Sequence, residues 1–285
     1  MSKVELRKYL SRDEAILADG GVITALYDKG FYINRSFEEL CLTDPQAVRD
    51  VTQGYFNAGA RLLKTNTFNA LIPKLTKYGL QKQHREILFN ATEIVQSVAG
   101  DEAYTLAAIG PLGVVVEPLG PTSFEEAEDL FGENVRIFEE AGVDGFILLG
   151  FHDFGELRSA LRAVKKWSQK PVIANIGIQE NMKTSFGNNL TEFAELGRKM
   201  EVDILGFSGE VGPSGILTAV EKLRALTSIP IAAFPNAGLP RYVNDEYIYM
   251  CSPDYMGKYA KRLVQAGANI VGGHSGVHED HVRAI

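Results

Sequence analysis

The chain has 285 residues, of which 45% are hydrophobic, 23% charged and 9% aromatic, a balance that excludes a disordered or fibrous protein. Its 29 Lys and Arg against 36 Asp and Glu give a net charge of −7, which disfavours a nucleic-acid binder that works by neutralising phosphates. No run approaches the roughly 20 apolar residues of a membrane span, and the charged N-terminus does not suit a signal peptide, so we expect a cytoplasmic protein without a membrane partner.

Eight short apolar runs alternate with helix-like segments, the pattern of parallel strands joined by crossover helices. The predicted strands are Ile16–Asp19, Arg61–Thr65, Tyr104–Ile109, Gly145–Leu149, Pro171–Asn175, Asp203–Phe207, Pro230–Phe234 and Asn269–Gly272. Eight such units predict a single-domain (β/α)8 TIM barrel over residues 1–285, since no linker divides the chain. The last helix, at HEDHVRAI, is either short or was cut from a longer polypeptide.

Functional residues of such a barrel lie at the C-terminal ends of the strands, where loops and helix N-termini converge. The candidates at these ends are Asp19, Asn66, Thr67, Gly110, His152, Asn175, Glu210, Asn236, His274 and Ser275. Each has a structural alternative: Asp19 suits a turn cap before two glycines, asparagines can bond nearby backbone, and Gly110 suits a tight turn.

The five histidines differ in context. His84, His278 and His281 fall in helical or helix-start segments and are predicted at the surface, whereas His152 follows the fourth strand in a loop. His274 is framed by glycines at the end of the eighth strand, the best position for catalysis or metal binding. Two distant cysteines without CxxC spacing predict neither a disulfide framework nor a local zinc site.

At these residues the sequence resembles the homocysteine S-methyltransferase family, which includes betaine- and S-methylmethionine-dependent enzymes and the N-terminal barrel of cobalamin-dependent methionine synthase. It also resembles the methyltransferase half of chains that continue into a methylenetetrahydrofolate reductase domain, which implies a possible folate-enzyme partner domain. The segments that carry the resemblance include ILADGGVITALYDKG, RLLKTNTFNA, AAIGPLG, GEVGPSGIL, FPNAGLPR and NIVGGHSGVHEDHVRAI. The resemblance implies a TIM barrel that transfers a methyl group between small molecules.

Two family features are replaced in this sequence. Members usually hold zinc with three cysteines, because a metal-bound thiolate stays nucleophilic at neutral pH. Gly209, His274 and Ser275 stand at those positions here, and Leu149 stands where the family commonly has a glutamate that can hold an ammonium group. We therefore predict no cofactor, with zinc as a minor alternative.

These observations leave three hypotheses. The first is a methyltransferase without zinc, with His274, Asp19 and Glu210 as catalytic residues. Either His274 acts as a general base or the acceptor is intrinsically nucleophilic. Its substrate-binding residues would be Asn66, Thr67, Gly110, His152, Asn175, Asn236 and Ser275. The second is a non-catalytic binding or partner barrel. The third is a zinc enzyme with unconventional ligands drawn from His274, Glu210, Asp19 and His152.

Overall fold

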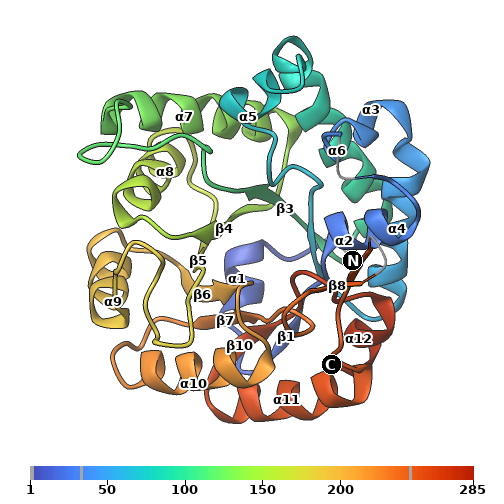
Figure 1. Ribbon diagram of the computed structural model, residues 1–285, viewed down its shortest axis with the longest axis vertical. Coiled ribbons are helices and arrows are strands. Elements are labelled where there is room, and N and C mark those ends of the chain that lie inside the picture. The colour runs from blue at the N-terminus through green and yellow to red at the C-terminus, as the bar shows by residue number, and fades with distance from the viewer. Residues whose placement is uncertain (1–2, 33–34, 244–245) are drawn as a thin grey trace.

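The computed structural model describes residues 3–32, 35–243 and 246–285, and its centre is a barrel of parallel strands (Figure 1). The hydrogen-bonded order is β1-β10-β7-β6-β5-β4-β3-β2, and a parallel bridge from Ala18 to Leu62 joins the two ends of this sheet. The barrel strands are β1 (Ile16–Leu17), β2 (Leu62–Lys64), β3 (Tyr104–Ile109), β4 (Gly145–Phe151), β5 (Val172–Ile176), β6 (Ile204–Ser208), β7 (Ile231–Phe234) and β10 (Ala268–Val271). The eight predicted strands and the TIM-barrel fold are confirmed.

Helices surround the barrel in the described residues (Figure 1). They are α2 (Val22–Asp28), α3 (Leu40–Thr43), α4 (Pro45–Asn57), α5 (Ile72–Thr76), α6 (His84–Ala99), α7 (Phe124–Ala141), α8 (Phe154–Trp167), α9 (Leu190–Lys199), α10 (Pro213–Arg224), α11 (Pro253–Gln265) and α12 (Glu279–Ala284), with a 3-10 turn at Gln81–Gln83. The helix α7 illustrates why they pack there: Phe131, Val135 and Phe138 recur at helical spacing and are fully buried. No helix in the described ranges is long and apolar enough to cross a membrane.

The short helix α1 (Leu6–Leu10) closes the end of the barrel opposite the candidate site. Leu6 and Leu10 belong to the same buried cluster as the inward-facing residues of the strands, such as Ile173 and Ile204. The hydroxyl of Tyr104, at the start of β3, donates to the backbone oxygen of Val4 at 2.7 Å. These contacts fill the N-terminal end of the barrel with buried side chains.

One element was not predicted. Between β7 and α11 the chain forms an antiparallel hairpin of β8 (Arg241–Val243) and β9 (Glu246–Ile248). Tyr247 lies 6.5 Å from Tyr27 of α2 between ring centroids, so the hairpin rests beside that helix. Its apolar side chains are exposed. The hairpin therefore lacks the alternation of buried apolar and exposed polar residues by which a strand is recognised in a sequence.

Candidate functional site

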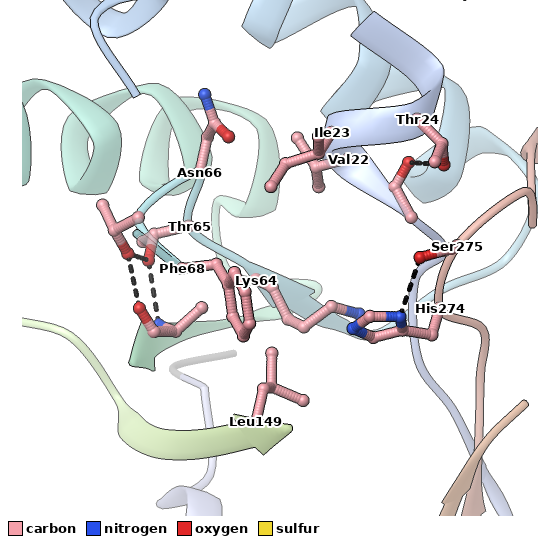
Figure 2. Close-up of a pocket in the computed structure, with 14 residues that line it drawn as sticks. Val22, Ile23, Thr24, Lys64, Thr65, Asn66, Phe68, Leu149, His274 and Ser275 are labelled. Atoms are coloured by element: carbon pink, nitrogen blue, oxygen red, sulfur yellow. Dashed lines mark hydrogen bonds between the residues drawn. The ribbon is translucent and has the colours of Figure 1, made fainter. Parts of the chain in front are cut away.

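A cavity of about 160 Å³ opens at the C-terminal ends of the strands, where the sequence predicted the site (Figure 2). Its walls come from the β1–α2 loop and the start of α2, the end of β2, β3, β4 and the loop after β10. The main side chains that face it are Val22, Ile23, Lys64, Asn66, Phe68, Leu149, His274 and Ser275. The exposed wall area is largely apolar, so a ligand here would be held mainly by burial of its apolar surface.

Lys64 and Asp19 form a buried ion pair beside this cavity. The ammonium of Lys64 contacts one oxygen of the Asp19 carboxylate, and the backbone N–H of Lys64 donates to the other at 2.7 Å. Burial raises the pKa of Asp19, and the charge and hydrogen bonds of Lys64 oppose that rise. Asp19 does not line the cavity, whereas Lys64 does.

His274 is positioned by Asn236. Oδ1 of Asn236 accepts the backbone N–H of Ser275 at 3.1 Å, which fixes the amide so that its oxygen faces Nδ1 of His274 at 3.2 Å. A carbonyl oxygen only accepts hydrogen bonds, so this contact places the ring proton on Nδ1. The hydroxyl of Ser275, 3.1 Å from the same nitrogen, is a second acceptor for that proton.

The other ring nitrogen of His274, Nε2, then carries a lone pair. Figure 2 shows it on the side of the ring that faces Lys64. Burial lowers the pKa of His274 to about 4, and the nearby Lys64 charge adds to this effect. The imidazole is therefore neutral at physiological pH, a hydrogen-bond acceptor but a weak base.

Three predicted residues near the cavity are held by bonds within the protein. Nδ2 of Asn66 donates to the backbone oxygen of Phe37 at 2.7 Å, and the hydroxyl of Thr67 donates to the backbone oxygen of Ala108 at 2.8 Å. The backbone N–H of Gly110 donates to Phe68 at 3.1 Å, and a Cβ at Gly110 would lie 2.7 Å from the Phe68 ring. Gly110 thus leaves room for Phe68 rather than lining the cavity itself.

Three other predicted residues lie away from the cavity. Asn175 is completely buried in β5, and neither polar atom of its side chain has a hydrogen-bond partner among the described residues. Nε2 of His152 lies 3.3 Å from the carboxylate of Glu210, which faces a second, more polar depression beside Glu180. The structure therefore groups His274, Ser275, Asn236, Asn66 and Thr67. It places Asp19 and Gly110 next to residues that line the cavity but not in its lining, and it leaves Asn175, His152 and Glu210 outside the group.

Sequence reasoning missed Lys64 and Phe68. Lys64 follows Leu62 at the two-residue spacing of an inward-facing strand position, and a lysine in such an apolar run was the available signal. Phe68 packs edge-on against His274, with 6.3 Å between ring centroids, and lies under the Lys74 ammonium. Neither contact follows from sequence spacing.

Two histidines predicted at the surface are buried instead. His84 is 3% exposed, and its Nε2 lies 2.9 Å from Oδ1 of Asn134 in α7. His281 is 9% exposed, and its Nε2 donates to the backbone oxygen of Cys251 at 2.8 Å. Partners from distant elements satisfy both rings, so burial costs little.

Comparisons with known proteins place the chain in a family. The model of the homocysteine S-methyltransferase family matches residues 16–285. This chain belongs to the homocysteine S-methyltransferase family. Methionine synthases of Mycobacterium leprae and Mycobacterium tuberculosis are 26% and 25% identical to it over 255 residues, 85% of this chain but 21% of each relative. The chain thus spans about a fifth of their length.

A solved structure supports the fold over the whole chain. The metallated form of the homocysteine methyltransferase MmuM from Escherichia coli has a TM-score of 0.83 and 19% identity, with 99% of this chain and 98% of that chain covered. The carboxyl transferase domain of Rhizobium etli pyruvate carboxylase shares the barrel more distantly, with a TM-score of 0.57 and 14% identity over 94% of this chain. These likenesses establish the barrel and leave the chemistry to the residues of the site.

The residues at the three positions that the family resemblance assigns to zinc ligands do not supply a usual set of zinc ligands. A Cβ at Gly209 would lie 3.2 Å from Nδ1 of His274, so the three positions do converge. They supply one imidazole and one hydroxyl, whereas zinc takes four ligands, usually thiolate, imidazole or carboxylate. Within the described ranges no three His, Cys, Asp or Glu side chains come together in a group that could hold a metal.

Proposed function

We propose that this family member transfers a methyl group to a small acceptor bound in the cavity, without a metal-bound thiolate. The observation that carries the proposal is the neutral His274 in a largely apolar cavity at the place where the family positions its zinc ligands. Family membership supports methyl transfer, and the replaced ligands support a different means of activating the acceptor.

The pKa of His274 argues against a thiol acceptor. A thiol has an ordinary pKa near 8.5, so proton transfer to an imidazole with a pKa of about 4 is unfavourable by more than about four orders of magnitude. We infer an acceptor that is nucleophilic without giving a proton to His274, as a thioether is.

The reaction then needs little acid or base chemistry. The thioether sulfur forms a bond to the methyl carbon of a sulfonium or quaternary ammonium donor, and the bond from that carbon to the donor heteroatom breaks. The electron pair of the broken bond stays on the donor, which leaves neutral, and the acceptor becomes a sulfonium. Phe68 and Leu149 exclude water from the acceptor, and Nε2 of His274 accepts a hydrogen bond from a polar group of the ligand. Orientation and exclusion of water supply the acceleration.

A labelled-methyl assay tests this function. The protein, in the presence of EDTA, is given CD3-labelled S-methylmethionine, betaine or methyltetrahydrofolate with small thioethers or homocysteine, and mass spectrometry detects the methylated acceptor. We expect a labelled sulfonium, formed from the thioether, whose yield decreases at least about tenfold in His274→Ala, which removes a group facing the cavity. Lys165→Ala, a surface change on α8, serves as the matched control.

Other results of this assay would contradict the proposal. Methylation of homocysteine alone, seen in a parallel assay without EDTA and abolished when EDTA is added, would indicate a zinc enzyme with unconventional ligands. Thioether binding with no labelled product from any donor would indicate a binding barrel. One observation favours that second candidate: Asp19, Asn66 and Asn236 already form hydrogen bonds within the protein.

A further inference from the structure

The cavity has a cationic wall whose counter-ion is hidden from it. Lys64 lines the cavity, whereas Asp19 does not and is only 1% exposed. The Lys64 ammonium lies between the carboxylate and the ring of Phe234, 5.0 Å from the ring centroid. Of the two charged residues, Lys64 is therefore the one that a ligand in the cavity can contact.

The Asp19 carboxylate is fully engaged by one residue. Its Oδ2 accepts the backbone N–H of Lys64 at 2.7 Å, and its Oδ1 contacts the Lys64 ammonium. A second ammonium group would have to displace Lys64 to reach either oxygen. Displacement would leave the Lys64 charge buried without a partner, a cost of several kcal/mol in proteins generally.

The remaining walls offer no substitute for that carboxylate. Among the residues that the structure describes, those that line the cavity include no aspartate or glutamate, and the side chains of Val22, Ile23, Phe68 and Leu149 are apolar. The one imidazole, that of His274, carries no negative charge. An incoming ammonium group would thus lose its hydration without gaining a charged partner.

We propose that Lys64 determines the specificity of the cavity: by occupying Asp19, it excludes acceptors that carry a free ammonium group and admits small thioethers that lack one. The volume of about 160 Å³ suits such a molecule, since a comparable apolar cavity holds benzene. This inference rests on the proposed function in taking the cavity as the site of the acceptor.

Three related thioethers test the inference on the unaltered protein. L-methionine carries an ammonium and a carboxylate, 4-(methylthio)butanoate carries the carboxylate alone, and 3-(methylthio)propan-1-ol is uncharged. Calorimetric titration should give a Kd for methionine at least about tenfold weaker than for either amine-free compound, because only methionine brings a like charge to Lys64. Equal or tighter binding of methionine would overturn the inference.

Two variants assign this selectivity to Lys64. Lys64→Met frees the Asp19 carboxylate and should tighten methionine binding by at least about tenfold relative to the unaltered protein. Asp19→Asn with Lys64→Met removes the whole ion pair and should not show that gain. Equal methionine affinity in both variants would contradict the role of Lys64.

Thermal melts establish that each variant is folded, and if Lys64→Met is not, the three-ligand comparison on the unaltered protein still decides the ammonium claim. All these readouts are equilibrium binding. A barrel that binds the amine-free thioethers selectively but transfers no methyl group would refute the proposed function and leave the specificity intact. Methylation of methionine by the protein would support the proposed function and refute the specificity assigned to Lys64.

Discussion

Oδ1 of Asn236 lies 3.2 Å from Nδ1 of His274, and the same oxygen accepts the backbone N–H of the next residue, Ser275. One amide thus fixes both the orientation of the imidazole and the nitrogen that carries its proton. The lone pair that remains on Nε2 is the feature on which the account of the site depends.

The tautomer of His274 can be measured directly. Long-range ¹H–¹⁵N NMR spectra should show a proton on Nδ1 in the unaltered protein, and Asn236→Ala should reduce that preference because the acceptor is gone. Asn236→Asp should raise the His274 pKa from about 4 by about one to three units, since a carboxylate stabilises the imidazolium. An unchanged pKa in Asn236→Asp would contradict the contact.

The lowered pKa of His274 also affects stability. In the folded protein the pKa is about 4, against an ordinary value of 6.5, so between these values the unfolded chain binds a proton that the folded chain does not. Stability should therefore fall as pH drops from 6.5 to 4, by at most about 3 kcal/mol from this residue.

His274→Asn isolates this contribution from other titrating groups. Urea denaturation at several pH values should show the free energy of unfolding of the unaltered protein declining more steeply below pH 6.5 than that of the variant. Parallel curves would mean that His274 titrates normally in the folded state.

The convergence of the three zinc positions makes a gain of function testable. A triple variant, Gly209→Cys, His274→Cys and Ser275→Cys, should bind about one zinc per chain, because a Cβ at Gly209 would lie close to residue 274. The positive φ of 74° at Gly209 should cost about 1 kcal/mol once a side chain is present.

Zinc titration with a colorimetric chelator compares the triple variant with His274→Cys plus Ser275→Cys, which keeps Gly209. We expect much weaker binding by the double variant. Equal zinc affinity in the triple variant and the unaltered protein would show that the positions do not converge as described.

Asn175 carries the clearest prediction on stability. Its amide is fully buried in β5 without a hydrogen-bond partner, so both polar atoms were removed from water without compensation. Asn175→Leu, of similar size, should raise the free energy of unfolding by about 1 kcal/mol. If urea denaturation shows instead that Asn175→Leu lowers the free energy of unfolding by a similar amount, the amide binds a buried water or a ligand.

The sequence was most informative about the barrel and the end that carries the site. The chain takes a positive φ shortly before four of the predicted strands, at Gly59, Gly142 and Gly267 and at the non-glycine Glu201. The conformation at a helix end depends on neighbouring residues, so it can be predicted without knowledge of the tertiary structure.

The partners within the site could not be predicted in the same way. The bonds of Asp19 to Lys64 and of Asn236 to His274 join residues 45 and 38 positions apart, and strand-end location does not say which side chains meet. The buried histidines His84 and His281 were missed for the same reason, because distant elements supply their partners.

The central claim is methyl transfer without a metal-bound thiolate, and one paired measurement tests it most directly. Protein purified without added zinc is analysed for metal by mass spectrometry and assayed for CD3 transfer to a small thioether before and after chelation. We predict far less than about one zinc per chain and methyl transfer that chelation leaves unchanged. Nearly one zinc per chain, with transfer that is lost on chelation and restored by zinc, would contradict it.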